Sequence, residues 1–269
     1  MPQRWSTLFL VAVLIVVTTV GVGVQQESIE DLRVKAEQGD AEAQYRLGVI
    51  YRQGQGVIPK DRKAAKWFRL ASDQGLDEAH NNLAILHMSG SGVRRDFVEA
   101  VRLFRLAAEN GFPNAQTSLG YMYFTGHGVV KDEAEAVRWY QLAADQGLSQ
   151  AQFNLGYAYD VGQGVPQDYV HAFDWYQLAA DQGLAGAQYN LGLMYETGKG
   201  VLQDDVQAYL WFARAAARST DEQRDRAIKN RDNVLGRLTV AQRTESQRLI
   251  QEWNEAHPRW VITGLGSAR

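Results

Sequence analysis

The strongest constraint on the fold is a repeat, because the sequence matches itself when it is shifted by 36 residues. Five copies cover residues 41–220 without a break. Seven columns are invariant, among them alanine (Ala43, Ala79, Ala115, Ala151, Ala187), leucine (Leu47, Leu83, Leu119, Leu155, Leu191) and glycine (Gly54, Gly90, Gly126, Gly162, Gly198). A period of about 20–50 residues is typical of stacked units that cannot bury their apolar faces alone. The sequence therefore predicts a repeat solenoid.

Each copy has the apolar spacing of two helices. In the first copy, a helix over about 41–53 is predicted by apolar and small residues on one face (Ala43, Leu47, Gly48, Tyr51). A second helix is predicted by the same spacing further on (Ala64, Trp67, Phe68, Ala71). The glycine columns that begin at Gly54 and Gly56 separate the two helices, because glycine accepts the left-handed conformation without steric cost. No segment shows the two-residue alternation of a strand.

An aspartate column marks the start of the second helix in copies two to five (Asp96, Asp132, Asp168, Asp204). An aspartate at this position can accept hydrogen bonds from the free backbone N–H groups of the helix. Glu99 and Glu135 follow three residues after an aspartate, which predicts the reciprocal bonds of a capping box. The first copy has Lys60 in this column, so we expect a weaker or displaced cap there.

Glycine stands within the first helix in four copies (Gly48, Gly120, Gly156, Gly192). Glycine costs about 1 kcal/mol relative to alanine in a helix, so we expect a neighbouring helix to approach too closely for a side chain. The tryptophan column of the second helix is expected to fill the space between repeats (Trp67, Trp139, Trp175, Trp211). Copy two has Ala84 and Leu103 in these columns, and we expect looser packing there.

The N-terminal residues 1–24 have the pattern of an export or membrane segment. Arg4 precedes residues 8–24, which carry no charge. The run fits a secretory signal with cleavage after Gly23, and it also reaches the lower length limit of a membrane anchor. Both interpretations place the rest of the chain outside the cytoplasm, because the positive end stays inside.

The repeat pattern A-x-x-x-L-G-x-x-Y-x-x-G-x-G-V, followed by D-x-x-x-A-x-x-W-Y/F-x-x-A-A-x-x-G, resembles the Sel-1-like repeat family, which is related to tetratricopeptide repeats. The resemblance covers about two thirds of the chain. It implies an all-α, right-handed superhelical solenoid and a role as an adaptor between proteins, often in bacterial envelopes or signalling. Many extracellular members carry a disulfide in each repeat, whereas this chain has no cysteine.

Shorter segments flank the repeats. Residues 27–40 are predicted to form an N-terminal half-repeat or capping helix, because AEQGD at 36–40 matches the end of a repeat. After the five repeats at 41–220, residues 221–256 are predicted to form polar capping helices, of the kind that terminal units of a stack require. Thr220 with Gln223 and Thr239 with Gln242 resemble capping boxes. Residues 257–269 form a tail too short for a core of its own.

The first helices present a second face, about a third of a turn from the core face. It is rich in aromatic residues, and in the related tetratricopeptide fold the corresponding positions line the concave groove. Aromatic residues are enriched at binding hot spots. We therefore predict that a peptide or helix binds there to Tyr45, Tyr121, Phe124, Phe153, Tyr157 and Tyr189. The alternative is that these rings pack on the first helix of the next repeat. Phe153, Tyr157 and Asp160 have no predicted packing role within their own unit.

The sequence contains no recognisable catalytic or cofactor-binding constellation. The G-x-G-V turns lack the residues of a phosphate loop, and their fivefold recurrence indicates a structural turn. His80 and His87 are two helical turns apart, about 10 Å, which is too far for one metal ion, so satisfied histidines are expected instead. The net charge of −3 and the pI near 6.0 offer no electrostatic basis for nucleic-acid binding.

These patterns, together with the role that the resemblance implies, predict a non-enzymatic scaffold of a bacterial-type envelope that binds a protein or peptide in its concave face, without a cofactor or metal. The expected location is periplasmic or secreted, with a membrane contact only through an uncleaved N-terminal segment. The alternative is a periplasmic regulator that inhibits a membrane sensor or a cell-wall enzyme. An enzyme is the third hypothesis, which the missing constellation disfavours.

Overall fold

The computed structural model describes residues 28–257, and within this range it is entirely helical. It has thirteen helices and no strand, which confirms the predicted all-α repeat solenoid. The predicted export segment at 1–24 and the tail from residue 258 lie outside the described residues. The helices are α1 (Ile29–Glu37), α2 (Ala41–Gln53), α3 (Asp61–Ser72), α4 (Asp77–Ser89), α5 (Phe97–Glu109), α6 (Pro113–Thr125), α7 (Glu133–Asp145), α8 (Ser149–Val161), α9 (Tyr169–Asp181), α10 (Ala185–Thr197), α11 (Asp205–Arg218), α12 (Asp221–Arg237) and α13 (Val240–Ala256).

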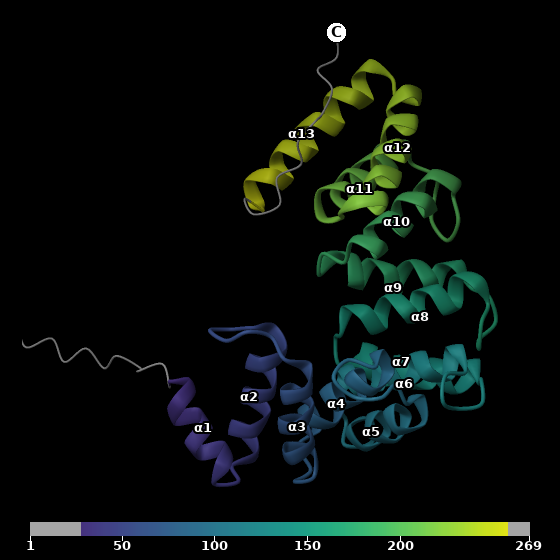
Figure 1. Ribbon diagram of the computed structural model, residues 1–269. Helices are drawn as coiled ribbons and strands as arrows, with labels where there is room; N and C mark the ends of the chain where they lie inside the picture. The colour runs from purple at the N-terminus through teal and green to yellow at the C-terminus, as the bar shows by residue number, and fades with distance from the viewer. Residues whose placement is uncertain (1–27, 258–269) are drawn as a thin grey trace, which may run out of the picture.

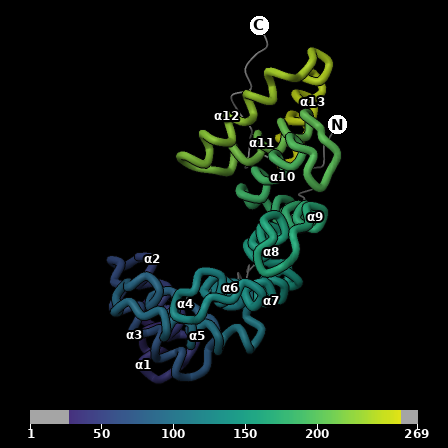
Figure 2. The backbone as a smooth tube through the Cα atoms, turned by 90° about the vertical axis from the view of Figure 1, so that its right-hand side faces the viewer, coloured from purple at the N-terminus to yellow at the C-terminus, as the bar shows by residue number. Residues whose placement is uncertain are grey.

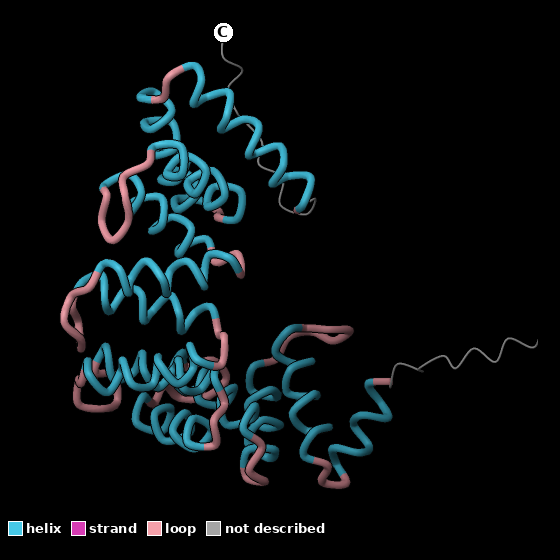
Figure 3. Tube along the Cα trace, turned by 180° about the vertical axis from the view of Figure 1, so that it is seen from behind, coloured by secondary structure: helices cyan, strands magenta, loops and turns pink. Residues whose placement is uncertain are grey.

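Each repeat is a pair of antiparallel helices stacked on the next pair (Figure 1). The stack is curved, and Figure 2 shows α2, α4, α6 and α8 on the inner side of the curve, with α3, α5, α7 and α9 outside. Over α6 to α10, the longer turns within repeats gather on one edge and the short turns between repeats on the other (Figure 3). The first helices of the repeats therefore line the inner face.

In the four copies that have a glycine within the first helix, this glycine is packed against an aromatic ring. A Cβ built on Gly48 would lie 2.5 Å from the Phe68 ring, and one on Gly156 would lie 2.8 Å from the Tyr176 ring. Contacts this short exclude any larger residue, so the predicted close approach is confirmed. The ring belongs to the second helix of the same repeat, in the position that follows the tryptophan column.

The tryptophans are therefore not the main filling of the core, which corrects the sequence-based expectation. Five residues that each follow the tryptophan column are at most 3% exposed (Phe68, Phe104, Tyr140, Tyr176, Phe212). Trp67, Trp139 and Trp175 are only half-buried, whereas Trp211 is 5% exposed. Trp175 packs on the core formed by α7 and α8, so it does bridge to the preceding repeat as expected.

The aspartate caps are present as predicted. The side chains of Asp96 and Asp132 accept hydrogen bonds from the backbone N–H groups three residues on, and Lys60 makes no side-chain cap. The capping-box glutamates point forward instead, because Glu99 and Glu135 pair with the arginines three residues later. Asp168 and Asp204 cap α9 and α11 in the same way as the first two.

A pair of glutamines joins successive repeats, a feature that the sequence analysis missed. Gln146 donates its amide N–H to the carbonyl of Gly111 in the preceding repeat, at 3.0 Å, and to Gln116 at 2.8 Å. Gln74 and Gln182 make the equivalent bonds in the first and fourth repeats. In repeats one, three and four, the hydrogen bonds tie the end of the second helix to the turn that precedes the repeat.

Copy two replaces this glutamine pair with His80 and Asn110. The His80 Nδ1 lies 2.6 Å from the Ser72 hydroxyl, and Asn110 donates to Asp77. The packing of copy two is not looser, contrary to expectation, because Ala84 is fully buried and Leu103 is 1% exposed. Ala84 is larger than the glycine of the other copies, and Leu103 is smaller than the tryptophan. The two differences compensate, so the contact between the helices stays filled.

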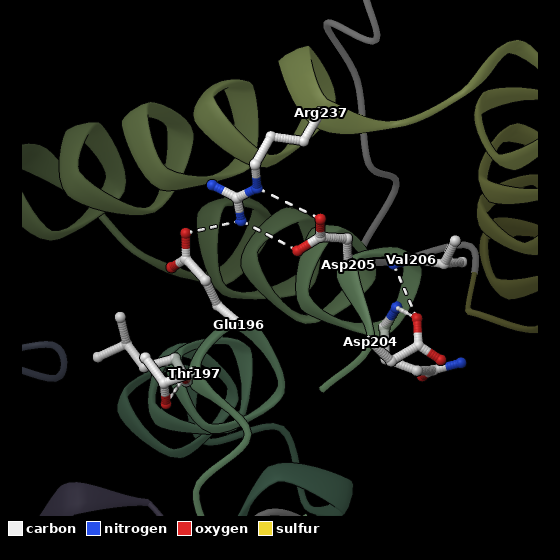
Figure 4. A network of polar contacts seen from close by, with 8 residues as sticks. Glu196, Thr197, Asp204, Asp205, Val206 and Arg237 are labelled. Atoms are coloured by element: carbon white, nitrogen blue, oxygen red, sulfur yellow. Dashed lines mark hydrogen bonds and ion pairs between the residues drawn. The ribbon is translucent and has the colours of Figure 1, made fainter. Parts of the chain in front are cut away.

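Two polar helices close the C-terminal end. Arg237 at the end of α12 binds Glu196 of α10 and Asp205 of α11, at 2.9 and 3.0 Å (Figure 4). Thr239 and Gln242 form the predicted capping box of α13, whereas the Thr220 side chain makes no cap bond at the start of α12. No helix within residues 28–257 is both long and apolar enough to cross a membrane.

Candidate protein-binding surface

The surface on the inner side of the curve is built from the first helices of the repeats, and we call it the inner face. Two of the six predicted binding residues are the most exposed rings on it. Tyr121 of α6 is 45% exposed and Tyr157 of α8 is 41% exposed. They occupy the same column in repeats three and four. Phe124 lies with its ring centroid 6.4 Å from that of Tyr157, in an edge-to-face arrangement.

The Phe124–Tyr157 contact joins α6 to α8. It therefore also agrees with the alternative interpretation, in which these rings pack on the first helix of the next repeat. The contact leaves the Tyr157 ring accessible and holds it in place. Edge-to-face pairs of this kind contribute about 0.5–1.5 kcal/mol beyond burial. The inner face of repeats three and four therefore presents ordered aromatic surface rather than loose side chains.

The other three predicted residues, Tyr45, Phe153 and Tyr189, are half-buried. Each packs on the core aromatic of its own repeat, with centroid distances of 5.9 Å to Phe68, 5.7 Å to Tyr176 and 5.5 Å to Phe212. Each ring is thus committed in part to the core of its own repeat, and each also lines a pocket. These rings are supports of the inner face as much as contacts for a ligand.

Asp160 also has a role within its repeat, which the sequence analysis did not assign. Its carboxylate accepts a hydrogen bond from the Tyr176 hydroxyl at 3.3 Å. Burial raises the pKa of Tyr176 and, in the third repeat, that of Tyr140, so both phenols stay protonated. Of Phe153, Tyr157 and Asp160, only Tyr157 keeps a largely free side chain.

A pocket of about 270 Å³ opens between the inner face and the C-terminal cap. Phe153 and Tyr189 form its aromatic wall, and Gly186 at the start of α10 packs closely on Phe153, since a Cβ there would lie 3.3 Å from the ring. The Tyr189 hydroxyl accepts a hydrogen bond from Asn230 of α12 at 3.0 Å. Polar groups complete the lining (Asn190, Ser219, Gln223, Arg226). The pocket is the right size for one large side chain of a ligand.

The four polar residues of this pocket were missed by the sequence analysis. Gln223 and Arg226 come from α12, which lies outside the repeat and so cannot be placed by column. Asn190 could have been found, because its column in the first helices reads Arg46, Asn82, Ser118, Asn154 and Asn190. A polar column beside an aromatic one is suited to bonding a ligand's backbone while the rings take its side chains.

A second pocket of about 480 Å³ lies at the opposite end of the stack, between α1 and α2. Tyr45 and Val49 line it together with Ile29 and Leu32 of α1. The predicted residues thus fall into three groups, with Tyr45 at the N-terminal end, Tyr121, Phe124 and Tyr157 in the middle, and Phe153 and Tyr189 at the cap.

The two histidines of α4 differ in how well they are satisfied. His80 is bonded to Ser72, as expected, but the buried Nδ1 of His87 has no hydrogen-bond partner. Within residues 28–257 no group of three or more His, Asp or Glu side chains is placed to hold a metal ion.

Comparison with known proteins places the repeats in a family. The model of the Sel1 repeat matches five consecutive segments: 41–76, 77–112, 113–148, 149–184 and 185–219. The chain belongs to the Sel1 repeat family. Proteins of this family generally act in protein–protein interactions and are generally not catalytic. The sequence has no match among curated proteins.

Solved structures of the family agree with this fold. The chain is similar to c5321, a protective antigen of uropathogenic Escherichia coli strains, with 34% identity and a TM-score of 0.67. The match covers 84% of this chain and 52% of c5321, so this chain spans about half the length of that protein. A Sel1 repeat protein from Oxalobacter formigenes is 32% identical, with a TM-score of 0.64 and coverage of 72% and 79%.

Proposed function

We propose that this chain is a non-enzymatic scaffold that holds an extended peptide or a helix of a partner protein on its inner face. The observation that carries the proposal is the exposure of Tyr121 and Tyr157, which are 45% and 41% exposed. They belong to α6 and α8, two of the helices on the inner side of the curve (Figure 2). Their arrangement beside Phe124, and the pocket of Phe153 and Tyr189 next to it, offer a row of aromatic contacts. Exposed, ordered aromatic rings in a concave surface are the usual energetic centres of protein interfaces.

The proposed location is the cell envelope, on the outer side of the cytoplasmic membrane. It is supported by the uncharged run at residues 8–24 behind Arg4. In this setting the partner is an envelope protein. The alternative role is that of a regulator, whose partner is one membrane sensor or one cell-wall enzyme.

Affinity capture from envelope extract tests the proposal. We expect the full chain to retain a protein partner, and the Tyr121→Ala/Tyr157→Ala variant to lose at least 10-fold in retained partner. Leu202→Ala is the matched control, because Leu202 is an 89% exposed apolar residue in a turn away from the inner face. Equal capture by the tyrosine variant and the wild type, with circular dichroism showing both folded, contradicts the inner face as the binding surface.

The same cells test the location by mass spectrometry of the mature N-terminus. A mature chain that begins at Val24 supports a cleaved signal, and a membrane-bound chain that retains residues 1–24 supports an anchor. A full-length chain found only in the cytosolic fraction contradicts both. One captured sensor or cell-wall enzyme indicates the regulator, and several unrelated partners indicate a general scaffold.

A further inference from the structure

The second helices carry a column of exposed leucines on the outer side of the curve, which we call the outer ladder. It consists of Leu70, Leu106, Leu142 and Leu178, which are 37–48% exposed. Three residues before each leucine stands the tryptophan column, and side chains three apart on a helix are neighbours. Repeats one, three and four thus each present a half-buried tryptophan beside an exposed leucine. Packing within the repeat does not require this leucine.

The C-terminal helix α13 shows how such a surface is covered. At the fifth repeat the column continues as Trp211 and Arg214. The Arg214 guanidinium lies 4.5 Å from the centre of the Trp211 ring and 5.8 Å from that of Trp253 of α13. Ile250 of α13 is 1% exposed, and Leu249 packs on the same core. Arg214 therefore lies between the Trp211 ring and Trp253 in the last turn of α13. Trp211 is 5% exposed, whereas Trp175 one repeat earlier is half-buried.

The uncovered surface is continuous with the covered one. Trp175 packs on the core of α7, which carries Leu142, and Trp211 packs on the core of α9, which carries Leu178. The column of Leu142 and Leu178 therefore leads along the stack to Arg214, over which Trp253 of α13 lies. Figure 2 shows α7 and α9 on the outer side of the curve, away from the inner face.

The charge around the outer ladder changes along the stack. Helices α7 and α9 carry one Arg and five Asp or Glu, a net charge of −4. Helices α3 and α5 carry six Lys or Arg and three Asp or Glu, a net charge of +3. Exposed carboxylates flank the outer ladder in repeats three and four (Asp145, Asp174, Asp181). Complementary charge on a partner determines which part of a ladder it selects.

We propose that the outer ladder of repeats three and four binds an amphipathic helix of a partner protein. The helix has an apolar stripe with an aromatic residue, which packs on Leu142, Trp175 and Leu178 as α13 packs on the fifth repeat. It has basic residues beside the stripe, which face the carboxylates of α7 and α9. This surface is separate from the inner face, so the scaffold has two binding surfaces on opposite sides of the stack.

The probe is a synthetic peptide with the α13 sequence, residues 240–256, in which Glu245, Glu252 and Glu255 are replaced by lysine. Fluorescence anisotropy with the full chain is expected to show saturable binding. The Leu142→Gln/Leu178→Gln variant is expected to bind at least 10-fold more weakly. Leu70→Gln/Leu106→Gln is the matched control, because it alters the same column beside basic helices, and its binding is expected to be unchanged. The peptide with the natural α13 sequence is expected to bind at least 10-fold more weakly.

The proposal is overturned if the lysine peptide shows no saturable binding, or if Leu142→Gln/Leu178→Gln binds it as well as the wild type does. Self-association that disappears in that variant would assign the surface to a second copy instead. If the Trp260→Ser variant binds the lysine peptide and the wild type does not, the outer ladder is assigned to the chain's own C-terminal residues instead. Both outcomes reject the partner helix, and neither affects the capture test with Tyr121 and Tyr157, because those residues lie on the inner face.

Discussion

His80 places a titratable group at a repeat joint where a hydrogen-bonding glutamine stands in the other first helices. The first helix carries glutamine at this position in the other four repeats (Gln44, Gln116, Gln152, Gln188). His80 is 8% exposed, and burial lowers its pKa below the usual value near 6.5. Asp77 and Asp73 oppose this decrease and Arg102 adds to it. The neutral imidazole, bonded to Ser72, is therefore the form that the folded protein favours.

This lowered pKa predicts an acid-sensitive joint. Below pH 6.5 the unfolded chain binds a proton at His80 before the folded chain does, so the free energy of unfolding falls as the pH falls from 6.5 toward the lowered pKa. One such proton changes stability by at most about 1.4 kcal/mol per pH unit. We expect urea unfolding between pH 7 and pH 5 to show a smaller loss for His80→Gln than for the wild type.

His127→Gln is the control for that experiment, because His127 lies exposed in the turn before α7. It should follow the wild-type pH profile. Identical profiles for His80→Gln and the wild type would show that His80 does not contribute to the acid sensitivity.

At the scale of the helices, the unit of stability is the ring of the second helix set against the glycine of the first. Tyr176 is fully buried against Gly156, whereas Trp175 is half-buried on the outer side. The sequence columns alone made tryptophan, the larger side chain, the obvious filling residue. In the structure the ring of the next residue fills the core instead. A helix turns by about 100° per residue, so only one of the two adjacent positions faces the glycine.

This arrangement predicts unequal costs for two adjacent substitutions. Tyr176→Ala removes a fully buried ring and is expected to lower the free energy of unfolding by about 3–5 kcal/mol. Trp175→Ala is expected to cost about half as much, because part of its ring surface stays in water when folded. Urea unfolding at pH 7.5 measures both. A larger loss for Trp175→Ala than for Tyr176→Ala would contradict the assignment of the core.

At the scale of the whole molecule, the sequence alone predicts the period, the helix pairs and the aspartate caps, because each recurs in several copies at a fixed spacing. It predicts the first helix of the first repeat at 41–53, where α2 lies. The sequence columns do not predict features that involve a helix outside the repeats. Arg226 of the inner pocket comes from α12, and the cover over Arg214 comes from α13. No column contains those helices, so their docking follows only from the three-dimensional stack.

The six inner-face residues show the same limit. The aromatic columns identify the face, but they do not distinguish Tyr157, which is 41% exposed, from Phe153, which packs on Tyr176. That difference depends on which ring the second helix contacts, since Tyr176 of α9 packs on Phe153. The central claim, that the inner face holds the partner, therefore depends most on Tyr157.

Site-specific photo-crosslinking at this residue is the most direct measurement. Benzoylphenylalanine in place of Tyr157, in the full chain in intact cells, is predicted to give a covalent adduct with a second protein on irradiation. The same group in place of Leu202, in the exposed turn between α10 and α11, is predicted to give none. An adduct at Leu202 as strong as that at Tyr157, or no adduct at Tyr157 at all, would contradict the account.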